Sequence, residues 1–330
     1  MIKLSIIIPQ YNESEMDIFP LLSSIDNQLG VDWNAIEVLI VNDRSKVRLS
    51  RRFLKQFHNC KPKYARLKKN VGQGPCRNAG MDMTTGEYIM FCDADDRFNM
   101  VIALWKYLKV IDAEHSDLIY SSYLVEAIDE NGNTGFCTYN YNNLFTEFSM
   151  VHGKLYRRRF LEQNDIRFLD KFRCHEDVYF NGLAFNLADK INLIELWLYV
   201  WVRNLKSITR SNGGKAAFSE YSTFIDASLE LLKVLAVKNP SCVQTVAADI
   251  LLDAYINLNK VIFRYRGKDF IAPAEKKLGN LCKQYDQYLN KFMETELAAM
   301  AERKEKLHTD LVPLRESFTD FLKRIKSFEK

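Results

Sequence analysis

The strongest constraint on the fold is an alternation of short apolar runs with amphipathic segments in the first third of the chain. Apolar runs occupy 4–9, 37–41 and 87–92, and the first two are rich in β-branched residues. Between the first two runs, apolar residues recur at helical spacing, at Ile18, Leu21, Leu22 and Ile25. Strands that alternate with helices form βαβ units, so we predict an α/β domain with a mainly parallel sheet.

The pattern changes after this region. Two strand-like segments, 118–125 and 135–141, flank an Asn131-Gly132 pair that is typical of a hairpin turn. Further along the chain we expect a strand over 150–156, a short helix near 157–163, a helix over 176–187 and a strand over 191–203.

The C-terminal third has a helical composition. Four helices are expected, near 218–238, 242–265, 273–304 and 310–328, with proline and glycine at their boundaries. We therefore predict a catalytic domain over 1–212, with halves at about 1–97 and 98–212, and a helical domain over 213–330.

Composition excludes several classes of protein. Of the 330 residues, 47% are hydrophobic and 12% aromatic, which favours a packed core over disorder. Seven cysteines without a CxxC pair argue against a disulfide framework or a zinc site, and are typical of a reducing compartment. The N-terminal apolar run is too short for a signal peptide, and no run of 18 apolar residues occurs. We expect a cytoplasmic protein.

Excess positive charge lies near the C-terminus. Residues 260–330 hold 16 Lys and Arg against 11 Asp and Glu, whereas the remaining residues hold 30 against 31. Either this is a solvated helical surface, or it is a face that attracts an anionic membrane or polymer. An apolar stripe at Phe318, Phe321, Leu322 and Ile325 favours packing or self-association first and peripheral membrane contact second.

An acidic cluster, Asp93-Ala94-Asp95-Asp96, directly follows the apolar run that ends at Cys92. Carboxylates at the end of a buried strand are costly unless something compensates their charge. A divalent cation such as Mg²⁺ or Mn²⁺ is a suitable compensator, because it takes carboxylate oxygens and bridges to phosphates. The alternative is a solvated, Asp-rich turn.

Polar groups follow two other strands at the same end. In open α/β sheets ligands bind beyond the carboxyl ends of the strands, so these groups predict one shared crevice. There Tyr11 suits stacking on a base, Asp43 suits a base N–H, and Arg77, in the glycine-rich segment 70–80, suits a base edge or a phosphate. The structural alternatives are a rim aromatic residue, a helix N-cap and a surface ion pair.

In order and spacing, five segments resemble the family 2 glycosyltransferases of GT-A fold: 5–12, 41–45, 70–80, 93–96 and 176–177. The resemblance implies a Rossmann-like sheet with helices on both faces and an inverting transfer from a UDP-sugar with Mn²⁺ or Mg²⁺. Two departures are Arg44, where the family often has glycine, and His175, where it also often has glycine.

The resemblance also implies roles for single residues. It implies that Asp95 and Asp93 bind the metal, that Asp177 is the catalytic base, and that Glu176 is the alternate base. The remaining nucleotide-sugar contacts that we expect are Pro9, Tyr11, Asn12, Asp43, Asn70, Arg77, Ala94, Arg203 and Ser207.

We expect a glycosyltransferase that adds a hexosyl or N-acetylhexosaminyl group to a lipid-linked or polymeric surface glycan, without a nucleic-acid partner. Homo-oligomerisation through the C-terminal helices is a further expectation. The alternatives are a non-catalytic nucleotide-sugar-binding or scaffold protein and a sugar-phosphate nucleotidyltransferase, although the latter would need a basic, glycine-rich loop after the first strand.

Overall fold

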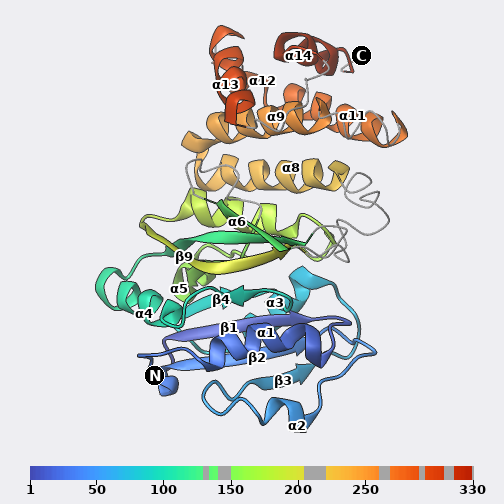
Figure 1. Cartoon of the computed structure of the whole chain (residues 1–330). Coiled ribbons are helices and arrows are strands. Elements are labelled where there is room, and N and C mark those ends of the chain that lie inside the picture. The colour runs from blue at the N-terminus through green and yellow to red at the C-terminus, as the bar shows by residue number, and fades with distance from the viewer. Residues whose placement is uncertain are drawn as a thin grey trace. The chain divides into compact units, whose positions relative to one another are not determined.

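The structure is a computed structural model that describes residues 1–128, 134–139, 150–203, 221–259, 268–289, 294–307 and 316–328 (Figure 1). The chain divides into two compact units, Met1–Leu205 and Lys206–Lys330. The expected hairpin turn around Asn131-Gly132 lies outside the described residues.

The first half of the sheet is parallel, as the alternating pattern predicts. Strand β1 (Leu4–Gln10) lies between β2 (Ile36–Asn42) and β4 (Tyr88–Phe91), and β3 (Lys63–Arg66) pairs with β2 at the edge. The register aligns Gln10 with Asn42. The carboxyl ends of these strands therefore lie side by side.

The second half of the sheet is mixed. From β4 the order continues through β8 (Lys154–Arg157), β6 (Leu118–Ile128), β9 (Ile191–Arg203) and β5 (Arg97–Phe98), and β7 (Thr134–Tyr139) pairs with β6. The β6–β7 and β4–β8 pairs are antiparallel, whereas β6 and β9 are parallel. The predicted hairpin strands are confirmed, but β5 was not predicted because two residues carry no periodicity.

Helices cover both faces of the sheet, as predicted (Figure 1). Helices α1 (Glu15–Asp26), α2 (Arg51–Leu54) and α4 (Ala103–Glu114) contribute to one apolar core with Leu4, Ile6 and Ile8 of β1. Ile7 points to the opposite face, toward α3 (Gln73–Asp82), because side chains alternate along a strand. A second core joins Phe91 of β4 to Phe168 and to Phe180 of α6 (Glu176–Leu187).

Two local predictions were correct only in part. The strand expected over 150–156 begins only at Lys154, because Gly153 has a left-handed backbone with φ 68°; α5 (Arg158–Gln163) follows it. For the helix after β4 the sequence predicts an apolar stripe of Ile102, Trp105, Leu108 and Ile111. In α4 Ile111 is buried as predicted and Leu108 packs partly against the core, but the fully buried side chains also include Leu104 and Tyr107, and Ile102 is exposed. The Tyr107 hydroxyl lies 2.6 Å from Ser121 Oγ, which satisfies its polar end in the core.

The second unit is helical. Its long helices are α8 (Tyr221–Lys238), α9 (Val243–Asn259), α11 (Lys268–Gln284), α13 (Glu294–Leu307) and α14 (Phe318–Ser327), with α12 (Asp286–Leu289) and a 3₁₀ turn (Pro240–Cys242) as shorter elements. The single helix expected over 273–304 is therefore three helices, and α11 begins before Pro273.

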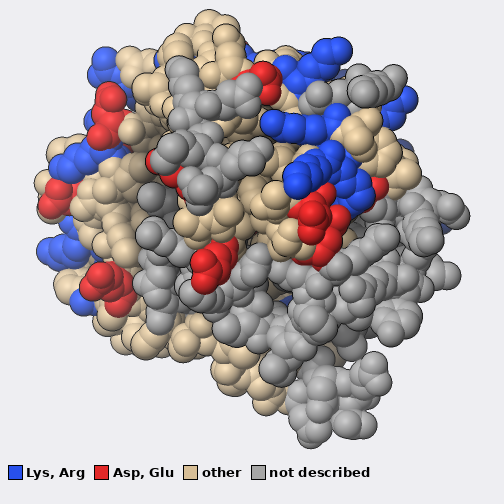
Figure 2. All heavy atoms as spheres, turned by 90° about the horizontal axis from the view of Figure 1, so that it is seen from above, with Lys and Arg blue, Asp and Glu red and all other residues tan. Residues whose placement is uncertain are grey.

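The apolar stripe of α14 is buried inside this unit. Phe318 and Phe321 pack against Tyr255 of α9, with ring centroids 5.2 and 5.3 Å apart. Arg324 pairs with Glu275 and Glu316. In Figure 2 Lys and Arg are interspersed with Asp and Glu over the described surface in view. These observations favour packing for the stripe; self-association and a cytoplasmic location stay predictions. In the described part of the chain, no helix has the length and apolar character needed to span a membrane.

Candidate active site

The loops after β1 and β2 are tied together at the carboxyl edge of the sheet. Asn42, at the end of β2, donates its side-chain amide to Gln10 Oε1 at the end of β1. The Asn12 backbone N–H donates to Ser45 Oγ at 2.9 Å. Tyr11 is 49% exposed between these contacts, whereas Pro9 is buried in β1. An exposed ring on a fixed loop is compatible with the predicted stacking on a base, which stays a prediction.

Asp43 organises the start of the glycine-rich segment. Its buried carboxylate accepts the Val71 N–H at 2.7 Å, the Gly72 N–H at 2.8 Å and the Asn70 amide at 2.9 Å. Gly72 has φ 93°, a conformation that glycine adopts without strain. A carboxylate offers about four acceptor sites, so one remains for the predicted base contact.

The other glycines of this segment allow close packing. A Cβ on Gly80 would lie 2.4 Å from Ile7 Cγ2, and one on Gly74 would lie 2.9 Å from Glu176 Cγ. Gly74 and Gly80 therefore let α3 pack closely against α6 and β1.

Arg77 of α3 is the centre of a buried ion-pair network. Its guanidinium donates to Glu176 Oε1 at 2.9 Å and to Asp93 Oδ1 at 2.8 Å, and it lies 5.4 Å from the centroid of the Phe168 ring. Although burial alone would lower the pKa of Arg77, the negative charges of Asp93 and Glu176 raise it further above its usual value. In this structure its partners are carboxylates, and the expected nucleotide contact stays a prediction.

The acidic cluster contains groups with different surroundings. Asp93 and Asp95 are half-buried, and Asp93 also accepts the Gln73 side-chain amide at 3.0 Å. Asp96 is fully buried and accepts the Tyr199 hydroxyl at 3.0 Å and the Val202 N–H at 2.8 Å. Burial and then the charges of Asp93 and Asp95 raise the pKa of Asp96 well above its usual value. Asp96 therefore anchors the cluster to β9.

His152 brings a nitrogen to this cluster. Ligand atoms of Asp93, Asp96 and His152 all lie within 4.8 Å of one another. His152 is buried against Tyr199, with the rings stacked 5.5 Å apart, and its Nε2 has no hydrogen-bond partner among the described residues. Burial, with Lys154 and Arg77, lowers its pKa and keeps the imidazole neutral, the form that binds metals. Two carboxylates and an imidazole suit a divalent ion such as Mn²⁺.

This candidate metal-binding set overlaps the predicted one without being identical to it. The sequence predicted Asp93 and Asp95, whereas the set that geometry brings together contains Asp93, Asp96 and His152. His152 is not among the metal ligands that the sequence predicts. No local pattern marks it as a ligand, because β8, β9 and the acidic cluster meet only in the fold.

The N-terminus of α6 presents two further carboxyl groups. Glu176 is buried and paired with Arg77, whereas Asp177 is half-buried and accepts the Val178 N–H at 3.0 Å. Burial and then the charge of Glu176 raise the pKa of Asp177 well above its usual value. Burial also raises the pKa of Glu176, although Arg77 opposes this. Of the two, Asp177 is the carboxyl group that no cation pairs with directly in the described structure.

The remaining predicted contacts fall into three groups. Ala94 is buried, and Asn12 and Asn70 are exposed at the same edge. Arg203 is exposed at the end of β9, and Ser207 lies outside the described residues. One more nearby group was missed: Glu13, half-buried, whose pKa burial raises to about 7, with added effect from the charges of Asp95 and Asp93.

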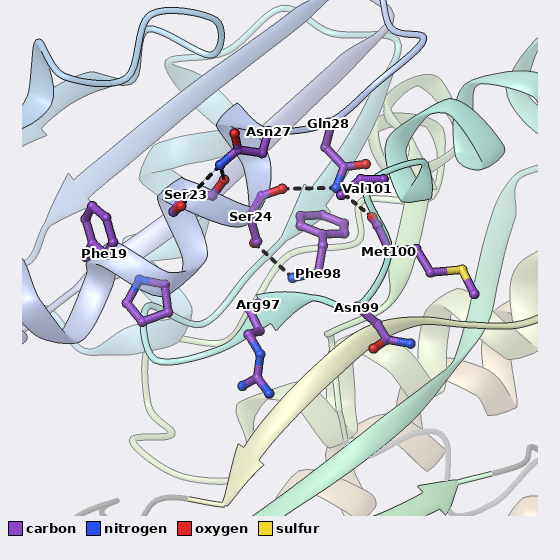
Figure 3. A pocket seen from close by; sticks show the side chains of 11 residues that line it. Phe19, Ser23, Ser24, Asn27, Gln28, Arg97, Phe98, Asn99, Met100 and Val101 are labelled. Carbon is purple, nitrogen blue, oxygen red and sulfur yellow. Dashed lines mark hydrogen bonds between the residues drawn. The ribbon is translucent and has the colours of Figure 1, made fainter.

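A separate hollow of 350 Å³ lies between α1 and the segment after β5 (Figure 3). Several polar groups that line it already form hydrogen bonds within the protein. Gln28 donates to the carbonyl oxygens of Ser24 and Met100 at 3.0 and 2.7 Å, and Ser24 Oγ accepts the Phe98 N–H at 3.0 Å. Figure 3 draws these hydrogen bonds, which join α1 to the segment 98–100. We therefore assign the hollow to the packing of α1 and not to the candidate active site.

Comparison with known proteins identifies related sequences and folds. The model of the family described as "Glycosyl transferase family 2" matches residues 5–181. The poly(ribitol-phosphate) beta-N-acetylglucosaminyltransferases TarS and TarP of Staphylococcus aureus are 29% and 27% identical, over 59% and 68% of this chain. The aligned part spans 34% of the length of TarS and 71% of that of TarP.

A crystal structure of S. aureus TarS 1–349 in complex with UDP-GlcNAc has the same fold. Its TM-score is 0.74 at 19% identity, and the match covers 99% of this chain and 92% of that one. A mannosyltransferase from Pyrobaculum calidifontis in complex with GDP-Man and Mn²⁺ has a TM-score of 0.56 at 13% identity, over 99% of this chain and 85% of that one. These matches confirm the predicted GT-A fold.

Proposed function

The chain belongs to glycosyl transferase family 2, and from that premise we propose that it transfers a sugar from a UDP-sugar to a hydroxyl group of a glycan polymer, with inversion at the anomeric carbon. The observation that carries this proposal is the Arg77 network. One buried guanidinium bonds both Asp93, at the end of β4, and Glu176, next to Asp177 at the start of α6. This network would hold the proposed metal-binding edge and the proposed base, Asp177, in one fixed arrangement.

Asp177 is the proposed general base. In the transfer step the acceptor oxygen bonds to the anomeric carbon, the bond from that carbon to the β-phosphate oxygen breaks, and UDP leaves with the electron pair. The acceptor proton passes to Asp177. A raised pKa makes its carboxylate a stronger base, and burial together with Glu176 supplies that shift. Glu176 is less suited, because its oxygen already accepts from Arg77.

Asp93, Asp96 and His152 would hold a divalent cation, and Asp95 is the further carboxylate that the family resemblance implies. When bound, such an ion neutralises the charge that develops on the diphosphate. Other residues of the site would bind the base or position the metal ligands. Tyr11 and Asp43 are proposed to bind the base, and Gln73 and Arg77 fix the position of the Asp93 carboxylate.

The names of the relatives suggest which substrates to test first. TarS has been crystallised with UDP-GlcNAc, and TarS and TarP are named for transfer to poly(ribitol-phosphate). We propose UDP-GlcNAc as the first donor and a polymeric hydroxyl acceptor of this kind as the first acceptor, with a lipid-linked glycan second. Other UDP-hexoses belong in the same panel.

The test is UDP release from UDP-GlcNAc, UDP-glucose and UDP-galactose with Mn²⁺, with and without acceptor. Metal-dependent release from one donor is expected, with a roughly hundredfold or greater loss in Asp177→Asn. Asp165→Asn is a matched control, because Asp165 is exposed and asparagine tolerates its φ of 53°. If no donor is turned over and calorimetry detects no metal-dependent UDP binding, the proposed function is wrong and a non-catalytic role is favoured.

A further inference from the structure

The segment 44–69 carries an unusual concentration of positive charge. It holds eleven of the 46 Lys and Arg residues of the chain and none of the 42 Asp and Glu residues. We call these eleven side chains the basic surface: Arg44, Lys46, Arg48, Arg51, Arg52, Lys55, Lys61, Lys63, Arg66, Lys68 and Lys69. Ten of them are exposed, and Arg66 is half-buried.

The basic surface begins at the same edge of the sheet as the candidate active site. Arg44 directly follows Asp43, and the register of β2 with β3 aligns Asn42 with Arg66. Lys68 and Lys69 then lead into Asn70, which donates to Asp43. The strand β3 forms the edge of the sheet, and α2, which carries Arg51 and Arg52, lies beyond it (Figure 1).

These charges are largely uncompensated. Among the described residues, the pair between Lys63 and Glu37 at 3.2 Å is the one ion pair that the basic surface makes. Arg66 donates to the Ser45 carbonyl oxygen at 3.0 Å, but its buried Nε has no hydrogen-bond partner in the described structure. Burial and the neighbouring charges of Arg44 and Arg48 lower the pKa of Arg66. Like charges held together repel, so an anion bound here would be stabilising.

The donor's own diphosphate is not a suitable occupant. In the proposed function it lies near Asp93, just after the end of β4, and two strands separate β4 from β3. Neighbouring strands lie about 4.8 Å apart, so β3 is roughly 14 Å from β4. A single phosphate would also leave most of the eleven cations unpaired. The observations therefore point to a ligand with repeated negative charges.

An anionic membrane surface also presents repeated negative charges. The lack of exposed large apolar side chains in the described segment 44–69 argues against a membrane as the ligand. Membrane-binding surfaces usually insert apolar side chains beside their cations. Phe53 and Phe57 of this segment are buried, and none of its described large apolar residues is among the exposed ones.

We propose that the basic surface binds an acceptor polymer with repeated phosphate groups and guides it toward the active site. This inference rests on the proposed function and adds the surface that would hold such an acceptor through its repeated phosphate groups. Arg77, Asp93 and Asp177 would act at one hydroxyl, while the basic surface holds neighbouring phosphodiester units.

The test uses pairs of substitutions that remove equal charge. Lys46→Gln/Arg48→Gln and Lys68→Gln/Lys69→Gln each remove two cations from the basic surface. Lys106→Gln/Lys109→Gln is the matched control, because it removes two cations from α4, a helix outside segment 44–69. Arg44 and Arg66 are left in place because Arg44 has a left-handed backbone and Arg66 holds the Ser45 carbonyl.

The first readout is binding of linear inorganic polyphosphate, which does not depend on turnover. At low ionic strength each double variant of the basic surface is expected to bind roughly tenfold more weakly than the control, and added salt should narrow the gap. The second readout is transfer to poly(ribitol-phosphate): the acceptor KM should rise by a similar factor, while the KM of the UDP-sugar stays unchanged.

Equal polyphosphate affinity in the double variants and the control would overturn the inference. So would loss of binding to phosphatidylglycerol vesicles without loss of polymer binding, which would indicate a membrane surface. Failure of the proposed function gives a different result, namely no UDP release from any donor, whatever polyphosphate binding shows.

Discussion

Arg77 and Glu176 lie 99 positions apart in the sequence and form a buried ion pair, with Nη1 2.9 Å from Oε1. The same guanidinium bonds Asp93 through Nη2. The pair thus connects the helix that carries the proposed base to the strand end that carries the proposed metal ligands. Several expectations depend on this connection.

Replacing Arg77 with methionine should destabilise the protein strongly. The substitution leaves Glu176 buried without its cation, and breaking a buried pair typically costs about 3–5 kcal/mol. Urea unfolding measures the change. Arg167→Met is the control, because its pair with Asp82 at 2.8 Å is largely exposed and should contribute under about 1 kcal/mol. Equal losses in the two variants would contradict the proposed importance of burial.

The activity should depend on pH through Asp177. Its raised pKa means that the carboxyl group stays protonated, and inactive as a base, to a pH well above its usual titration range. We therefore expect kcat/KM to increase as pH rises through the raised pKa. A pH profile of the wild type measures this, and a profile that is flat through the acidic and neutral range would be inconsistent with Asp177 as the base.

The stability should respond to the same group with the opposite sign. A carboxyl group whose pKa is raised by folding destabilises the folded state as pH rises from about 3.9 toward the folded pKa. Asp177→Asn removes that ionisation and keeps an oxygen for the Val178 N–H. The inactive variant should therefore be more stable than wild type at pH 8, by about 1 kcal/mol. Thermal unfolding at pH 4 and pH 8 would show whether the gap grows with pH.

His152→Phe should weaken metal binding without loosening the core. Phenylalanine retains the stack on Tyr199 but has no ligand nitrogen. The affinity for Mn²⁺ in the presence of UDP should fall roughly tenfold or more. His58→Phe is the control, because His58 is exposed and is not part of the cluster of Asp93, Asp96 and His152. Asp95→Asn and Asp96→Asn in the same titration would decide which carboxylate accompanies Asp93.

Gly80→Ala tests the packing of α3. The added methyl group would lie 2.4 Å from Ile7 Cγ2, so we expect a loss of about 1–3 kcal/mol in the free energy of unfolding. Gly135→Ala is the matched control, since nothing lies within 4 Å of a Cβ there. A tolerated Gly80→Ala would mean that β1 and α3 can separate locally.

Regular elements were the most predictable part of the fold. The sequence predicts α6 and β9 at the bounds that the structure has, because their apolar patterns are long and end at clear boundaries. The apolar face of α1 is also as predicted. The stripe of α4 was predicted only in part: Ile111 is buried as expected, but Tyr107 is buried with its hydroxyl bonded to Ser121, a contact that helical periodicity alone does not indicate.

The candidate site was predictable only in part. The acidic cluster and the Glu176-Asp177 pair stand out in the sequence, because charged groups follow apolar runs or begin a helix. Their partners do not: Tyr199 donates to Asp96 across 103 positions, and His152 reaches the cluster from the segment before β8. Such contacts depend on the order of strands in the sheet, and this order cannot be read from the residue pattern of a single sequence.

The close fit of Gly74 and Gly80 has a consequence for how the enzyme can move. With α3 in contact with both β1 and α6, the helix that carries Arg77 has little room to slide or rotate. The guanidinium is thus oriented when the chain folds, and no reorientation is needed in each catalytic cycle. Conformational changes during turnover would then occur in the loops that follow the strands. Helix α3 would stay fixed between the proposed donor and acceptor sites.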